Sequence, residues 1–208
     1  HSLPRIIQGG MGVAVSNWKL ARAVSLRGQL GVVSGTALDT VFVRRLQDGD
    51  PDRDMRRAIA AFPLRDVAAN AIEKFFIDGG KPKDQPYRLL PMFRQYVSAE
   101  RQQLTVLANF VEVFLAKENH GGVVGINFLT KVQMPTLPSL YGAMLAGVDY
   151  VLMGAGIPRE IPGALDALSS QQAASLKFEI EGGSPSEPVH LTFDPSSLGF
   201  DTSVPLKR

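Results

Sequence analysis

The stretch that decides the fold is Val123-Val124-Gly125-Ile126-Asn127-Phe128-Leu129, which is apolar on both faces apart from one asparagine. A strand with this pattern is covered on both sides, as in the parallel sheet of an α/β protein. Alternation places Gly125, Asn127 and Leu129 on one face. A buried side-chain amide needs hydrogen-bond partners, because leaving it unpaired costs roughly 1–3 kcal/mol. Two interpretations of Asn127 stay open: it binds the polar edge of a cofactor, or it ties neighbouring strands together.

Outward from this strand, helical and strand-like stretches alternate. The apolar spacing predicts a long helix before the strand and shorter helices after it, and the apolar runs that end in glycine predict further strands. This alternation is typical of βα units that form a parallel sheet. The predicted helices span residues 17–27, 98–118, 137–146 and 159–169, and the predicted strands span residues 5–7, 30–33, 123–129 and 149–154.

Two segments depart from this alternation of strands and helices. Residues 38–96 are an insertion or cap, with helices predicted near 39–47, 52–61 and 64–76 and a surface loop at 79–86. Residues 176–180 and 189–193 alternate apolar and polar side chains, which predicts a β-hairpin followed by an irregular tail. We therefore divide the chain into residues 3–170, the α/β part with its insertion, and residues 171–208, the hairpin and tail.

The composition excludes several classes of protein. Of the 208 residues, 45% are hydrophobic and 20% are charged, so the chain is too apolar to be intrinsically disordered. No apolar run reaches the length of about 20 residues that a membrane helix needs. There is no cysteine, which excludes disulfides and thiolate metal sites and fits a reducing, cytoplasmic compartment. The net charge of +2 includes no Lys/Arg cluster, so we expect neither a nucleic-acid nor a membrane partner.

Glycine or a small polar residue follows three of the predicted strands, at Gln8–Gly12, Ser34–Thr36 and Gly154–Gly156. Ligands of parallel α/β folds bind at the carboxyl ends of the strands, and glycine there lets backbone N–H groups approach a flat ring or a phosphate. A single glycine turn would be only a tight βα connection. Several on successive strands favour a shared ligand, and Lys131, which follows the Asn127 strand closely, could meet an anionic one.

Other motifs contribute little. Gly10-Met11-Gly12 begins like a dinucleotide fingerprint, but the third glycine position is Val15 and no acidic residue ends the second strand. His120 and His190 have no sequence partner that marks either as a catalytic base. No spacing of metal ligands is present. The sequence therefore assigns neither a catalytic residue nor a metal site.

Four segments in order resemble the nitronate monooxygenase family, formerly called 2-nitropropane dioxygenases. They are Ile6–Gly12, Leu30–Thr36, Gly125–Leu129 and Asp149–Pro158, and the resemblance covers residues 4–168. It implies an FMN-dependent flavoprotein with a (β/α)8 TIM barrel and an added helical segment. The implied reaction is the oxidation of an alkyl nitronate with dioxygen to a carbonyl compound and nitrite, in which FMN does the redox work without a metal.

The resemblance also implies which residues bind FMN. The backbone around Gly9, Gly10 and Met11 would face the flavin ring, and Asn127 matches the strand-end asparagine of the family. The complete set of implied cofactor-binding residues is Gln8, Gly9, Gly10, Met11, Gly12, Ser34, Gly35, Thr36, Asn127, Lys131, Gly154, Ala155 and Gly156.

The chain also departs from the family. The catalytic histidine and the glycine-rich loops that hold the FMN phosphate lie in later strands of the family, and no segment here matches them. Only about four of the eight βα units of a barrel are present. We therefore expect an N-terminal part of a longer enzyme, which pairs with the missing half of the barrel or with another chain. Two alternatives remain: an FMN-dependent enoyl reductase of fatty-acid or polyketide synthesis that uses NAD(P)H, and a non-catalytic binding module derived from a barrel.

Overall fold

A three-stranded parallel sheet lies at the centre of the computed structural model, which describes residues 3–94, 96–178 and 189–207. Its strands are β1 (Gly31–Ser34), β2 (Val124–Leu129) and β3 (Tyr150–Gly154), in the order β1-β2-β3. β2 is the middle strand, as its two apolar faces require. A second, antiparallel pair consists of β4 (Ala174–Phe178) and β5 (Val189–Phe193). The predicted mixed α/β class is confirmed, and the described strands form no closed barrel.

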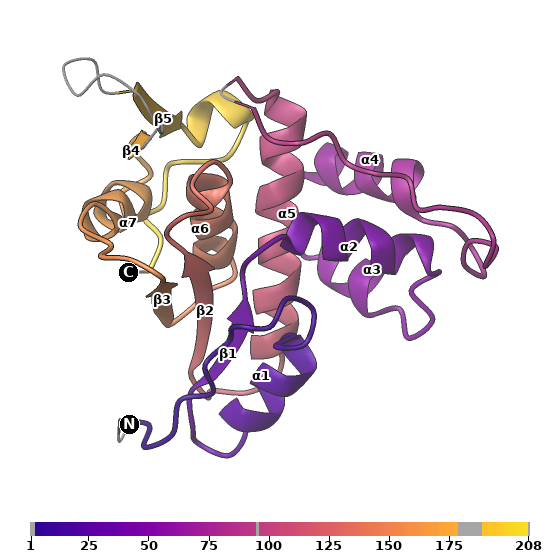
Figure 1. The fold of residues 1–208 in the computed structure, drawn as a ribbon, viewed down its shortest axis with the longest axis horizontal. Helices are drawn as coiled ribbons and strands as arrows, with labels where there is room; N and C mark the ends of the chain where they lie inside the picture. The colour runs from indigo at the N-terminus through magenta and orange to yellow at the C-terminus, as the bar shows by residue number, and fades with distance from the viewer. Residues whose placement is uncertain (1–2, 95, 179–188, 208) are drawn as a thin grey trace.

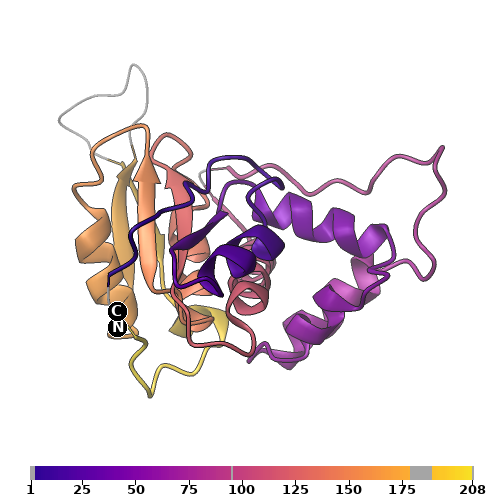
Figure 2. The ribbon, with the colours of Figure 1, turned by 90° about the horizontal axis from the view of Figure 1, so that it is seen from below.

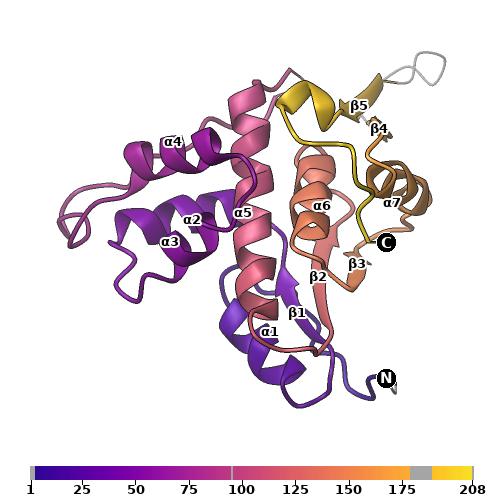
Figure 3. The same ribbon diagram turned by 180° about the vertical axis from the view of Figure 1, so that it is seen from behind.

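Helices surround this sheet and extend away from it. The long helix α5 separates α2, α3 and α4 from the sheet with α6 and α7 (Figures 1 and 3). In the described part of the chain the helices are α1 (Trp18–Ser25), α2 (Leu38–Gln47), α3 (Asp54–Ile59), α4 (Arg65–Phe75), α5 (Ala99–Lys117), α6 (Thr136–Leu145), α7 (Ile161–Ser169) and the 3-10 helix η1 (Ser196–Leu198). Within that part, no helix combines the length and the apolar character needed to cross a membrane.

Helix α5 is buried around more of its circumference than a single apolar stripe would cover. The hydroxyl of Ser98 accepts a hydrogen bond from the N–H of Arg101 at 3.2 Å, which fixes the start of the helix. Besides its apolar positions, α5 buries the polar residues Thr105, Asn109 and Glu112. The reason is that α1, α2, α3, α4 and α6 all pack against it. The insertion is thus joined to the sheet through this helix.

The first predicted strand, residues 5–7, forms only one bridge. Ile7 pairs in parallel with Leu30, and the Leu30 N–H donates to Ile6 C=O at 3.0 Å. The next N–H of that edge, from Val32, bonds instead to the side-chain Oε1 of Gln8 at 2.9 Å. The direction and neighbour of this segment agree with a βα unit, but the ladder stops because a side chain takes the place of the backbone carbonyl.

Two helix boundaries differ from the prediction for identifiable reasons. Helix α3 begins at Asp54 rather than near residue 52, because the Asp50 carboxylate accepts the N–H groups of Met55 and Arg56, both at 3.0 Å. Helix α5 ends at Lys117, one residue before the predicted end, and Asn119 follows it in the left-handed conformation (φ 59°). The predicted hairpin is confirmed in β4 and β5, while residues 179–188, which include the end of its predicted first strand and its whole connecting loop, lie outside the described residues.

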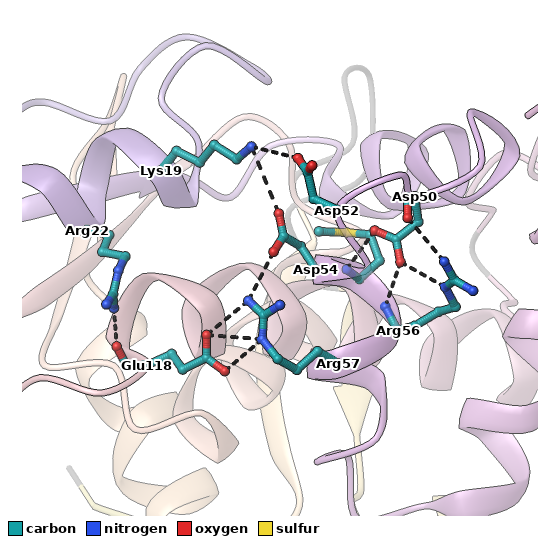
Figure 4. A network of polar contacts seen from close by, with 9 residues as sticks. Lys19, Arg22, Asp50, Asp52, Asp54, Arg56, Arg57 and Glu118 are labelled. Carbon is teal, nitrogen blue, oxygen red and sulfur yellow. Dashed lines mark hydrogen bonds and ion pairs between the residues drawn. The ribbon is translucent and has the colours of Figure 1, made fainter. Parts of the chain in front are cut away.

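A polar network attaches α3 to both α1 and α5 (Figure 4). The Arg57 guanidinium bonds to Glu118 at 3.0 Å and to Asp54 at 3.0 Å. Lys19 of α1 approaches Asp54 at 3.9 Å and Asp52 at 3.4 Å. The cations and Asp52 are exposed while Asp54 and Glu118 are partly buried, and pairs with an exposed partner contribute little to stability, so the network fixes position more than it adds stability.

Asp149, at the start of β3, is held by charged groups from distant segments. Its Oδ2 pairs with Lys117 and accepts the N–H of Val124 at 2.9 Å, and its Oδ1 is 2.7 Å from Lys207 Nζ. Burial acts to raise the pKa of Asp149, but these hydrogen bonds outweigh it and hold the pKa below its ordinary value of 3.8. Because the folded pKa is depressed, the stability that this carboxylate contributes is present above pH 3.8 and is lost as the pH falls through the folded pKa.

Asp149→Asn should therefore be less stable than the parent chain near neutral pH, with the gap closing in acid. Urea unfolding at about pH 7 and about pH 3 measures the difference in the free energy of unfolding between the variant and the parent chain at each pH. Asp84→Asn, in the exposed loop, is the control and should leave both midpoints unchanged. A gap of equal size at the two pH values would show that the charge of Asp149 is not what stabilises the fold.

Candidate functional site

The carboxyl ends of the three parallel strands meet at one edge of the sheet. Ser34 lies opposite Asn127, and Leu129 lies opposite Gly154. The Gly35 N–H donates to Asn127 C=O at 2.7 Å, which continues the ladder beyond β1. The sheet therefore brings three of the predicted strand-end segments together, as parallel strands do.

The N-terminal segment Gln8–Gly12 folds over this edge and packs directly on the sheet. Gly10 has a φ of 69°, and a Cβ placed there would lie 2.4 Å from Val32 Cγ1 and 3.2 Å from Asn127 Cβ. Only glycine permits this approach, both sterically and conformationally. A Cβ at Gly9 would meet nothing closer than Met11 Cγ at 4.0 Å, so the outer side of this backbone is open. Met11 itself is 59% exposed.

This segment is held in place by two polar residues. Gln8 donates through Nε2 to Ser16 Oγ at 3.2 Å, in addition to its bond with Val32. The backbone carbonyl of Ser16 accepts the N–H of Ser34 at 2.8 Å. The loop between residue 8 and α1 is thus tied to β1 at both of its ends.

Asn127 is the buried polar group at the centre of this edge. It is 7% exposed, and its side-chain amide forms no hydrogen bond with any residue of the described part of the chain. Although the residue as a whole is buried, the oxygen and nitrogen of its amide are not among the fully buried atoms that lack a partner, so the amide reaches solvent at this edge. The interpretation that Asn127 only ties neighbouring strands together has no support in these contacts. The amide is available to a ligand.

Gly35 and Thr36 lie on the other side of the sheet from Gly10. A Cβ at Gly35 would lie 2.2 Å from the Phe128 ring, which faces the helices. Together with Asn109 they line a cavity of about 30 Å³ between the sheet, α5 and α6. The Oδ1 atom of Asn109 is buried there without a partner, and a space of this size suits a single water molecule.

Lys131, Ala155 and Gly156 line a different and larger hollow of about 860 Å³, between the two loops that follow β2 and β3 and strand β4. Thr130 fixes the wall of this hollow: its hydroxyl donates to Ala155 C=O at 2.8 Å, and a Cβ at Gly156 would lie 2.3 Å from Thr130 Oγ1. Gly154 stands between the two regions, since a Cβ there would lie 3.6 Å from Met11 Cε. The predicted residues thus share one edge of the sheet but line separate spaces.

Three residues that sequence reasoning did not single out belong to this edge: Thr130, Arg159 and Lys177. The first two could have been found, because they follow the same strand ends as Asn127 and Gly154. Lys177 could not, because only the tertiary structure places β4 beside the loop after β3.

Neither His120 nor His190 lies at this edge. The Nε2 atom of His120 is 2.7 Å from Ala116 C=O and its Nδ1 accepts the Gly122 N–H at 3.1 Å, so its ring closes the end of α5. His190 lines a separate groove with Tyr96 and Leu137. The aspartates at positions 48, 50, 52 and 54 all have partners within the chain. Asp48 accepts a hydrogen bond from Tyr87, and Asp50 accepts one from a backbone N–H of α3. Asp52 pairs with Lys19, and Asp54 pairs with Arg57. Among the described residues, no group of three or more histidine or carboxylate side chains could hold a metal ion.

No family model, no curated protein and no solved structure matches this chain in the comparisons with known proteins.

Proposed function

We propose that this chain is part of an FMN-dependent oxidoreductase of the nitronate monooxygenase type, which oxidises alkyl nitronates with dioxygen to a carbonyl compound and nitrite. The observation that carries the proposal is Asn127, a buried residue next to Gly10 whose side-chain amide forms no hydrogen bond with the described residues and reaches solvent at this edge. An amide offers both an acceptor and a donor, the pair needed by the polar edge of a flavin ring.

The residues at this edge fit the ring of FMN. The backbone of Gly9 is exposed and a Cβ there would meet only Met11 Cγ at 4.0 Å, so a planar ring can approach this backbone closely, while Gly10 is buried against the sheet. Asn127 would bond its polar edge, and Met11, which is largely exposed, would supply an apolar contact. When bound, FMN would supply the redox chemistry, accepting electrons from the nitronate and passing them to dioxygen. The chain's own part is to bind and orient the ring and to exclude water from one of its faces.

We further propose that the three parallel strands, with residues 5–7 beside β1, are the first part of a TIM barrel. The support is their order and direction, and the position of β3 at the edge of the sheet. Tyr150 of that edge strand is 39% exposed and Ile157 after it is 76% exposed. An unpaired edge with exposed apolar side chains suits pairing with another strand. The remaining half of the barrel, or another chain, would therefore join at β3.

Asn127→Ala should weaken flavin binding about tenfold, the value of one or two hydrogen bonds between the flavin and the Asn127 amide. Riboflavin and FMN are titrated into the chain, and binding is followed by flavin fluorescence and absorbance. Asn109→Ala removes a second buried asparagine on the helix side of the sheet and should leave flavin affinity unchanged. If the parent chain binds neither flavin, or if both variants bind equally well, the proposed flavin site is wrong.

The reaction itself separates this function from the enoyl reductase alternative. Flavin-loaded protein should consume dioxygen and release nitrite when an alkyl nitronate is added. Enoyl reduction that depends on NAD(P)H, without nitronate-dependent oxygen uptake, would assign the alternative instead.

A further inference from the structure

We propose that the hollow between the loop after β2, the loop after β3 and strand β4 binds an organic phosphate. Three cationic side chains from separate elements line it: Lys131, Arg159 and Lys177. None of them forms an ion pair or a side-chain hydrogen bond with another residue of the described chain. Elsewhere in the molecule, cations such as Arg45, Arg57 and Lys117 are paired with carboxylates. The hollow therefore gathers positive charge that the fold itself does not neutralise.

Among the described residues that line this hollow, the single carboxylate does not cancel that charge. Glu160 accepts the backbone N–H of Lys177 at 2.8 Å through Oε2, so it fixes β4 against the loop after β3. In the described lining, three cations and one carboxylate leave a surplus of two positive charges. A phosphate monoester, which carries nearly two negative charges at neutral pH, complements this surplus.

Helix α7 adds to the same field. It has nine residues and begins at Ile161, which lines the hollow, and no side chain caps its first turn. The positive end of its dipole therefore opens toward the hollow. This contribution is secondary to the three cations, but it has the same sign.

The remaining lining shows that the ligand has an apolar part. Met153, Ile161 and Leu176 contribute apolar side chains, and the volume of about 860 Å³ admits a molecule of cofactor or drug size. The wall is preorganised, because Thr130 bonds to the loop carbonyls and leaves no room for a side chain at Gly156. A bare inorganic anion would use only the charged part of such a site. An organic phosphate uses both parts.

If the proposed function holds, this phosphate has two possible sources: the phosphate of FMN itself, or a separate phosphorylated ligand. Both present the same group to Lys131, Arg159 and Lys177. The charge argument does not depend on a flavin, so the inference can be tested separately.

The experiment titrates phenyl phosphate and, as the uncharged counterpart, phenol into the chain and measures binding by calorimetry. Phenyl phosphate should bind at least about tenfold more tightly than phenol. The double variant Lys131→Ala/Lys177→Ala should lose at least about tenfold in affinity for phenyl phosphate and keep its affinity for phenol. Lys83→Ala, in the exposed loop at 79–86, is the matched control. Equal phenyl phosphate affinity in the parent and the double variant overturns the inference.

Riboflavin, FMN and phenyl phosphate together identify the source. If the double variant weakens FMN but not riboflavin, and FMN displaces phenyl phosphate, the hollow takes the phosphate of FMN. If phenyl phosphate still binds to FMN-saturated protein, and only its affinity falls in the double variant, the ligand is a separate one. Both results support the site. A chain that binds phenyl phosphate through these lysines but binds no flavin keeps this inference and overturns the proposed function.

Discussion

Glu112→Ala is expected to lower the free energy of unfolding by about 3–5 kcal/mol. Glu112 is 3% exposed on α5. Its Oε2 lies 2.5 Å from Arg45 Nη1, and its Oε1 accepts the N–H of Trp18, the first residue of α1, at 2.8 Å. Alanine would leave the Arg45 guanidinium without its carboxylate and would remove the partner of an N-terminal helix amide. Both losses occur where α1, α2 and α5 meet.

Urea unfolding at neutral pH measures the effect, and Arg57→Ala provides the comparison. Arg57 also pairs with a carboxylate of this region, Glu118, but its side chain is 44% exposed (Figure 4). We expect that variant to lose only about 1 kcal/mol or less. Glu112→Gln, which keeps the size and one acceptor, should fall between the two. Losses of similar size for Glu112→Ala and Arg57→Ala would contradict the assignment of Glu112 as the buried junction of three helices.

Gly142→Ala should destabilise the protein by about 2–3 kcal/mol, although alanine normally favours a helix. Gly142 lies in α6 where that helix packs against α5, and a Cβ there would lie 2.2 Å from the Val106 carbonyl oxygen. Because that atom belongs to the backbone, no side-chain rotation can relieve the overlap. The two helices would have to move apart, which would open the core on both sides of α5.

Gly163→Ala is the matched control, since Gly163 also lies within a helix, α7, but a Cβ there would have no neighbour within 4 Å. This variant should gain about 0.5–1 kcal/mol from helix propensity. Thermal or urea unfolding of both variants gives the two changes. Stabilisation by both substitutions would show that α5 and α6 are not in close backbone contact.

The contacts of Glu112 and Gly142 show what the local sequence could predict in this part of the chain. The helical periodicity of residues 98–118 predicted α5 and its apolar positions. It did not predict that Glu112 is buried, because a glutamate in a helix is usually solvated. Its burial depends on Arg45 and Trp18, which lie 67 and 94 residues away in sequence. Long-range charge pairing of this kind has no local signature.

The candidate site, too, was predicted from the local sequence only in part. Alternation along β2 placed Asn127 on one face with Gly125 and Leu129, but only the structure shows that Gly10 covers this face and that Gly35 packs on the other face, against Phe128. The glycine motif at residues 9–12 predicted that the backbone approaches a ligand, and the close approach that the structure shows, of Gly10 to Val32 within the chain, was not predicted. The hollow lined by Lys131 was not predictable as a cationic site. Two of its three cations come from a strand and a loop whose contact is set by the bond from Lys177 N–H to Glu160.

The sequence by itself determined the elements of this protein, because periodicity, helix caps and glycine act over a few neighbouring residues. It therefore predicted the alternating helices and strands, the parallel sheet and the hairpin. Only the tertiary structure decided that residues 5–7 form a single bridge, that Gly10 and Gly35 lie on opposite sides of the sheet, and that three cations line one hollow beside β3. These features depend on contacts between segments far apart in the chain, where packing and electrostatics outweigh local preference.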